Sequence, residues 1–249
     1  MKLLSEVTQK SKKNLLTYAL GLIKCYKKTF VAIGRCFGIS HDSLNRVVYQ
    51  TSLVTTFFPS IAISLANHYH KTKPGWLIID DTFLCKAFAR LLEGVWWMYD
   101  AVTGRPQKGV SIVVLVWGNG IITIPLGFEW LFSKEINPDN HETKSIVAKK
   151  LLIDIARKVN FRYLLIDAHY TTTELMTFFW IKKIKFIGKF PKNRKIKTCD
   201  GAYERAEIHP LLKLNKNSRN VKVKTLFGGL TLYIAAHKRK NRKGDYTFV

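Results

Sequence analysis

Residues 76–82, Trp76-Leu77-Ile78-Ile79-Asp80-Asp81-Thr82, form the stretch that decides the fold. Four apolar residues follow the turn signal Pro74-Gly75 and lead directly into two adjacent carboxylates. A short apolar run bounded in this way is typical of a strand that is buried on both faces of a sheet. Ionised aspartates at the end of such a strand repel each other and are costly to bury, so a cationic group is expected beside them.

A second stretch of the same form, Tyr163-Leu164-Leu165-Ile166-Asp167, lies downstream. It predicts another buried strand that delivers an aspartate to its carboxyl end. Two such strands in a strongly basic chain indicate a divalent-metal site that acts on phosphodiesters.

Charge is distributed unevenly along the 249 residues, whose formal net charge is +24. Residues 1–72 carry +8, residues 73–181 carry +1 and residues 182–249 carry +15. The acids are therefore concentrated in the middle, and the basic flanks are typical of surfaces that bind a polyanion. Nucleic acid is the favoured partner. An anionic membrane surface is the alternative, but the basic runs lack an amphipathic helical pattern.

The length and apolar content predict a globular chain with one large domain or two small ones. Four widely spaced cysteines predict neither a zinc site nor a disulfide framework and favour a reducing cytoplasm, and no signal peptide is evident. The apolar run over residues 110–128 is interrupted by Asn119-Gly120, a strong hairpin signal, so it predicts two strands rather than a membrane helix.

Residues 1–72 are predicted to be helical. Helices are expected over residues 14–26, 29–36, 41–48 and 52–70, the last broken at Pro59, with residues 71–75 as a linker. The second and third helices and their glycine-containing turn resemble a helix-turn-helix, with Arg46 as a candidate DNA contact. An ordinary helical hairpin with a glycine cap is the alternative interpretation.

From residue 76 onward the predicted elements alternate. They are a strand over 76–80, an irregular excursion, a hairpin of 109–117 with 121–126, a helix over 140–159 capped by Asn137 or Asp139, a strand over 163–167, a helix over 172–183 and a strand over 186–190. Thr171 and Glu174 form a capping-box pattern that leaves Asp167 without a capping role.

This order predicts an α/β fold in which residues 73–190 form a ribonuclease H-like mixed sheet flanked by helices. That fold places its carboxylates on the first and fourth strands, side by side at the centre of the sheet. An N-terminal helical domain is expected before it, and residues 191–249 are expected to form a basic, β-rich extension paired in hairpins.

The motifs along this region resemble a known family. The strand ends IIDDT and LLIDAHY, the segment EGVWWMYD followed by KGVSIVVLVWGNGIITIPLGF, and FPKNRK after the last core strand are similar to bacterial insertion-sequence DDE transposases. More narrowly, they resemble the group whose β-rich insertion separates the second aspartate from the catalytic glutamate. The resemblance covers residues 76–249.

The resemblance implies that Asp81 and Asp167 are catalytic and, with a glutamate, hold two Mg²⁺ or Mn²⁺ ions, while Asp80 is the less favoured neighbour. The ions would activate a water or a 3′-hydroxyl and stabilise the leaving oxygen. The implied reactions are strand cleavage at the ends of an insertion sequence and strand transfer. The implied partners are those ends and target DNA, with a homodimer on the DNA. Four basic side chains beside the last core strand are candidate phosphate contacts: Lys189, Lys192, Arg194 and Lys195.

The third acid of the family lies on a late helix in the pattern Tyr-x2-Arg-x3-Glu, and this pattern has no counterpart here. No tyrosine has an arginine three positions later, and Tyr203 and Tyr233 have alanines there. The expectation is that the chain stops before that helix and is an incomplete, inactive transposase. Two alternatives are a DNA-binding remnant without catalysis and a stand-alone ribonuclease H-like nuclease that uses Glu204 or Asp245.

Overall fold

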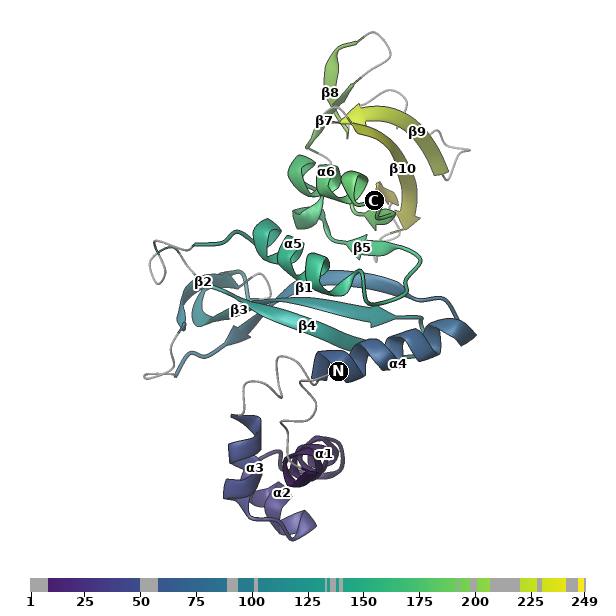
Figure 1. Cartoon of the computed structure of the whole chain (residues 1–249). Coiled ribbons are helices and arrows are strands. Elements are labelled where there is room, and N and C mark those ends of the chain that lie inside the picture. The colour runs from purple at the N-terminus through teal and green to yellow at the C-terminus, as the bar shows by residue number, and fades with distance from the viewer. Residues whose placement is uncertain are drawn as a thin grey trace. The chain divides into compact units, whose positions relative to one another are not determined.

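The computed structural model (Figure 1) describes residues 9–49, 58–88, 94–100, 103–132, 134, 138, 141–191, 193–197, 201–206, 220–227, 230–240 and 246–248. The chain divides into two compact units, Met1–Leu65 and Ala66–Val249. Within the described residues, none of the helices has the length and apolar character needed to span a membrane.

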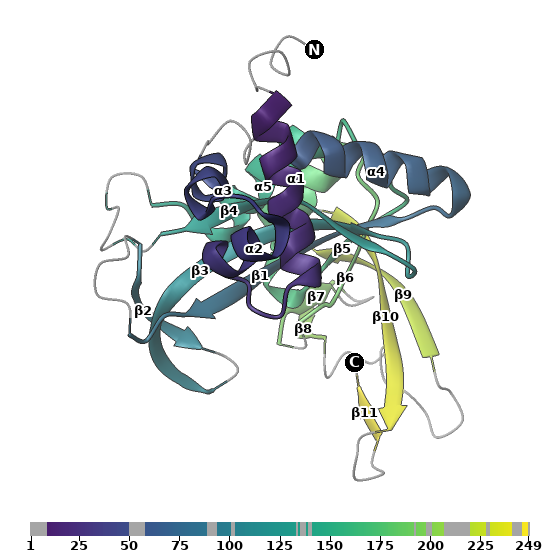
Figure 2. The ribbon, with the colours of Figure 1, turned by 90° about the horizontal axis from the view of Figure 1, so that it is seen from below.

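Three helices pack together in the first unit: α1 (Gln9–Lys24), α2 (Phe30–Phe37) and α3 (His41–Val48). Ile33 and Leu44 are fully buried in the small core between them. Thr29 caps α2 by accepting a hydrogen bond from the backbone N–H of Ala32 at 3.2 Å. Gly38 ends the helix with φ +66°, a left-handed conformation that favours glycine. The three predicted helices are confirmed, and Figure 2 shows them from a second side.

The fourth helix, α4, spans Phe58–Thr72. Pro59 was expected to break a helix over residues 52–70, but it lies in the first turn of α4. The backbone N–H groups of a first turn have no partner within the helix, so a proline is tolerated there. Residues 52–57 lie outside the described part of the chain. Because Lys71 and Thr72 belong to α4, the connection to the sheet is only residues 73–75.

A six-stranded mixed sheet is the centre of the second unit. Its order is β2 (Trp96–Asp100), β3 (Arg105–Gly118), β1 (Trp76–Cys85), β5 (Leu164–Ile166) and β6 (Phe186–Gly188), and β4 (Thr123–Leu131) also pairs with β3. β1 is antiparallel to β3 and parallel to β5. The ribonuclease H-like arrangement expected from the sequence is confirmed: the first strand lies beside the strand that follows the hairpin and the helix.

β1 is longer than the strand predicted over residues 76–80. It pairs with β3 along its whole length, so that Asp81 lies opposite Val113 and Cys85 lies opposite Gly109. The two acids are therefore inside the strand rather than at its end. The pairing partner, which lies far along the chain, decides where the strand stops, and the local sequence carries no signal for it.

Two helices of this unit have threonine as their N-cap. α5 (Lys144–Ile155) is capped by Thr143, whose side chain accepts from the N–H of Ile146 at 3.4 Å. The predicted start at residue 140 is therefore wrong, and the predicted caps Asn137 and Asp139 lie outside the described residues. The predicted end at residue 159 is also four residues too late.

α6 (Thr173–Ile181) is capped by Thr172, which accepts from the N–H of Leu175 at 3.2 Å. The predicted capping box at Thr171 is wrong, because the Thr171 hydroxyl donates instead to the carbonyl of Ala168 at 2.8 Å. Asp167 precedes a short 3₁₀ turn, η3 (Ala168–Tyr170), and makes no capping hydrogen bond with its side chain, as predicted.

The core of the second unit lies between the sheet and α5, which crosses one sheet face in Figure 1. β1 contributes Leu77 and Ile79, and β3 contributes alternate residues of the same face. Trp117 is fully buried, and its indole N–H donates to the carbonyl of Asn160 at 3.0 Å. The fully or almost fully buried side chains of this layer also include Val113, Leu115, Val147, Ala148 and Leu152.

The chain beyond β6 forms short β ribbons. β7 (Lys195–Lys197) pairs with β8 (Tyr203–Arg205), and β10 (Leu230–Lys240) pairs with β9 (Asn220–Phe227) and with β11 (Tyr246–Phe248). Ile196 and Ile234 are buried together. The predicted β-rich hairpins are present.

The packing of β3 can be tested by a matched pair of truncations. Leu115→Ala is expected to lower the free energy of unfolding by about 2–5 kcal/mol, because it leaves a cavity in the core. Ile121→Ala shortens a side chain that is 74% exposed in the turn after β3 and is expected to change stability by less than about 0.5 kcal/mol. Urea denaturation followed by circular dichroism measures both, and equal effects would contradict the packing described.

Candidate functional site

Asp81 lies on the face of β1 that carries Leu77 and Ile79, because side chains alternate along a strand. Its side chain is 20% exposed. Oδ2 accepts a hydrogen bond from Nζ of Lys144 at 2.6 Å, and Oδ1 accepts one from the hydroxyl of Tyr170 at 3.1 Å. Lys144, the first residue of α5, is thus a cationic group of the kind that the sequence led us to expect beside these acids.

Tyr170 is almost completely buried at the end of η3, with 1% of its surface exposed. Burial raises the pKa of its hydroxyl well above the ordinary value, and the negative charges of Asp81, Asp80 and Asp167 raise it further. The phenol therefore stays protonated and can only act as a donor towards Asp81.

Asp80 and Asp167 are the next residues after the last matched pair of β1 and β5, Ile79 with Ile166. Both acids are exposed. Asp80 accepts a hydrogen bond from the backbone N–H of Asp81 at 2.9 Å, and its side chain leaves β1 on the face opposite that of Asp81. In this parallel register Asp167 is level with Asp80, whereas Asp81 lies one residue further along β1 and its side chain is on the other face.

The donor chemistry of this site suits a hard divalent cation, because carboxylate oxygens are the ligands that Mg²⁺ and Mn²⁺ prefer. Among the described residues, however, no cluster of three or more His, Cys, Asp or Glu side chains is spaced to hold a metal ion. The carboxylates here therefore suit such an ion chemically, but within the described residues they do not form a complete ligand set.

The predicted basic residues fall into different environments. Lys189 follows β6 and is exposed, and its backbone N–H donates to the carbonyl of Ile166 at 3.3 Å, which places it beside the end of β5. Lys195 is exposed at the start of β7, and Arg46 is exposed on α3 in the first unit. Lys192 lies outside the described residues.

Arg194 has a structural role that the sequence did not reveal. Its guanidinium donates to the backbone carbonyl of Thr171, and partial burial lowers the pKa of the side chain. Its own carbonyl accepts from the N–H of Ala206 at 2.8 Å. Arg194 therefore ties the loop after β6 to the segment that follows Asp167, and this contact joins residues 23 positions apart, which local patterns cannot predict.

The chain was compared with protein families, curated proteins and solved structures. The model of the family described as DDE superfamily endonuclease matches residues 2–205. No curated protein matches the sequence. Among solved structures, the chain is similar to one titled "Mos1 transposase paired-end complex with left transposon end", with a TM-score of 0.26 and 10% sequence identity. That match covers 70% of this chain, which spans 57% of the length of the transposase chain.

The contribution of the Arg194–Thr171 hydrogen bond to stability can be distinguished from that of a surface charge. Arg194→Ala is expected to lower the free energy of unfolding by about 1.5–3 kcal/mol, because it removes a charged donor from a carbonyl of the buried residue Thr171. Lys195→Ala removes the same charge from an exposed neighbour and is expected to cost less than about 0.5 kcal/mol. Chemical denaturation monitored by tryptophan fluorescence compares them, and an equal loss in both variants would argue against the tie.

Proposed function

The chain belongs to the DDE superfamily endonucleases, and from this premise we propose that it is a transposase that cleaves DNA at the ends of an insertion sequence and transfers the strands to a target. The observation that carries the proposal is the pairing of β1 with β5 at the centre of the sheet, because both strands lead into acids there. Of these acids we propose Asp81 and Asp167 as the ones that hold the metal.

Asp81 and Asp167 would hold Mg²⁺ or Mn²⁺, which supplies activation of a water or 3′-hydroxyl and stabilisation of the leaving oxygen. The contribution of the chain is to fix these acids. Asp81 is part of a strand paired on both sides, and Tyr170 orients its carboxylate from the core. Asp167 directly follows a buried strand, so its backbone position is set by the sheet.

DNA would be held by basic side chains around this end of the sheet. Lys189 and Lys195 are exposed after β6, and phosphate contacts from such residues position a duplex without reading its sequence. In the first unit, α2 and α3 would serve as the helix-turn-helix, with Arg46, which is exposed on α3, as a contact to DNA. The net charge of +24 supports attraction to DNA as a whole.

We infer that this chain supplies two of the three acids of the complete site. The pattern Tyr-x2-Arg-x3-Glu occurs nowhere in the 249 residues, and Tyr203 and Tyr233 lie in strands rather than on a helix. The chain by itself is expected to bind DNA and metal but to cleave weakly or not at all. A DNA-binding protein without catalysis is the second candidate function, and the same missing pattern favours it.

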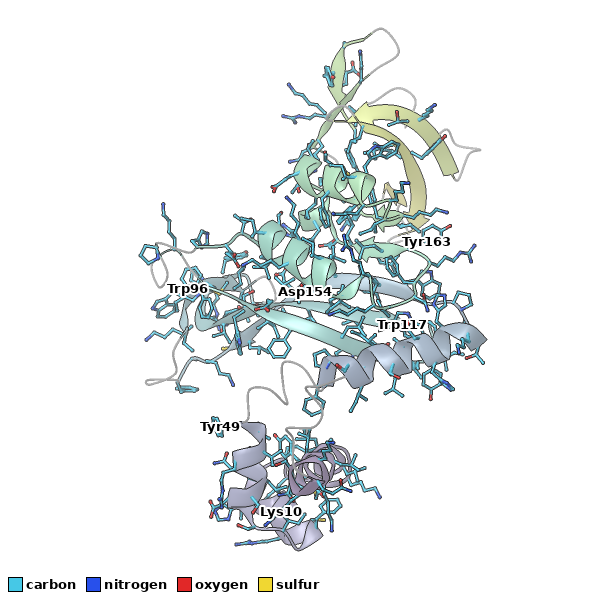
Figure 3. All side chains as sticks on the ribbon, in the orientation of Figure 1. Lys10, Tyr49, Trp96, Trp117, Asp154 and Tyr163 are labelled. Carbon is cyan, nitrogen blue, oxygen red and sulfur yellow. The ribbon has the colours of Figure 1, made fainter. Side chains whose placement is uncertain are left out.

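The metal assignment can be tested by Mn²⁺ binding, followed by electron paramagnetic resonance of the free ion. Asp81→Asn and Asp167→Asn are each expected to weaken binding by about tenfold or more, because each removes a charged ligand. Asp154→Asn, at an exposed acid of α5 labelled in Figure 3, is the control and should bind as the wild type does. Asp80→Asn tests the neighbouring acid in the same way, and weaker Mn²⁺ binding by this variant would make Asp80 a metal ligand as well.

The same variants in a plasmid-nicking assay separate the two candidate functions. Mg²⁺-dependent nicking that is lost in both Asp81→Asn and Asp167→Asn supports the transposase. DNA binding without nicking by the wild type supports the non-catalytic candidate. Metal binding that both substitutions leave unchanged would refute the assignment of the two acids.

DNA affinity is expected to fall steeply with salt, with a log–log slope of about −0.9 for each phosphate contacted. Lys189→Ala and Lys195→Ala should each reduce that slope by about 0.9. Lys158→Ala is the matched control, because residue 158 lies in the segment that leads into the start of β5, at the end away from Asp167. Fluorescence anisotropy at several salt concentrations measures the slopes. An equal change of slope in all three variants would contradict specific phosphate contacts by Lys189 and Lys195.

A further inference from the structure

Each oxygen of the Asp81 carboxylate has its own partner. Oδ2 is paired with the ammonium of Lys144 at 2.6 Å, and Oδ1 is paired with the hydroxyl of Tyr170 at 3.1 Å. The two partners come from different elements, the start of α5 and the end of η3. A cation that binds Asp81 must therefore share or replace one of these contacts.

The two contacts differ in how easily they can be broken. Tyr170 has only 1% of its surface exposed, so its hydroxyl cannot leave Asp81 unless the ring leaves the core. The side chain of Lys144 is 38% exposed and long, so its ammonium can move into solvent while its stem stays in place. Ion pairs of partly exposed lysines also contribute little stability. Lys144 is thus the partner that can be displaced.

We propose that Lys144 and a divalent cation compete for Oδ2 of Asp81, and that Tyr170 is a positioning residue that holds the carboxylate from Oδ1 while they exchange. The competition follows from charge, because an ammonium and a divalent cation on one oxygen repel each other. This inference rests on the proposed function, since it takes Asp81 as a metal ligand. It assigns to Lys144 the role of a built-in counter-cation that lowers the metal affinity of the site.

The other lysines of α5 provide matched controls. Lys150 lies on the same helix, but its ammonium pairs with Glu142 instead of Asp81. Lys149 pairs with Glu174 at the start of α6. A methionine at any of these positions removes one positive charge and keeps the length of the side chain, so a general charge effect would be the same for Lys144 and Lys150.

The experiment is a Mn²⁺ titration of the full chain by electron paramagnetic resonance. Lys144→Met is expected to bind Mn²⁺ about three- to tenfold more tightly than the wild type, because a competing charge has gone. Lys150→Met should stay within about twofold of the wild type. Tyr170→Phe is expected to weaken binding by about tenfold, as losses of groups that orient metal ligands do. Lys144→Gln is also expected to bind Mn²⁺ more tightly than the wild type, and it provides the same test if Lys144→Met fails to fold.

The outcomes distinguish this inference from the proposed function. If the wild type binds Mn²⁺ and Asp81→Asn weakens that binding, but neither Lys144 variant binds more tightly, the competition is wrong and the metal assignment stands. If Lys150→Met tightens binding as much as Lys144→Met, a general charge effect replaces the specific one. If Asp81→Asn binds as the wild type does, Asp81 is no ligand, and both the proposed function and this inference fail.

Discussion

The site depends on the hydrogen bonding of β1 on both of its sides. β3 pairs with it in the antiparallel sense over ten residues, and β5 pairs with it in the parallel sense over three. A strand held in this way cannot shift without breaking two ladders, so the acids that it carries have fixed positions. The buried side chains of Leu77 and Ile79 anchor the same strand against the core. The precision of the site therefore comes from the sheet and not from loops.

The charge balance of the second unit follows from this frame. Although the chain is strongly basic, three lysines of α5 each pair with an acid: Lys144 with Asp81, Lys149 with Glu174 and Lys150 with Glu142. These pairs join α5 to β1, to α6 and to the residues before its own N-terminus. Three acids of the near-neutral middle of the chain thus take part in packing between elements, while Lys189 and Lys195 are exposed after β6.

The buried strands could be predicted because an apolar run between a turn signal and acids is a local pattern. Their ends could not be predicted, since β1 continues to Cys85 only because β3 is there to pair with it. The choice between two adjacent threonines as the cap of α6 likewise depends on a distant contact, because the Thr171 hydroxyl also reaches the carbonyl of Lys189 at 3.3 Å. Sequence patterns identify candidates, and tertiary contacts choose among them.

The candidate acids were found from their place after the two apolar runs, but their partners were not. Lys144 and Tyr170 are 63 and 89 residues away from Asp81. Lys144 is an ordinary lysine after a capping threonine, and Tyr170, although it ends the motif LLIDAHY, has no local signal for a contact with Asp81. Only the order of strands in the sheet brings them together, so the electrostatics of the site could not be derived before the fold was known.

The alternation of β1 gives its two adjacent aspartates different surroundings. Asp81 faces α5 and the core, whereas Asp80 faces the opposite side of the sheet. Even- and odd-numbered residues of this strand therefore face different sides of the sheet and have different surroundings, although they are neighbours in the chain. Inserting one residue between Trp76 and Asp81 would move the acid only a few ångströms along the strand, yet it would turn the acid away from both of its partners.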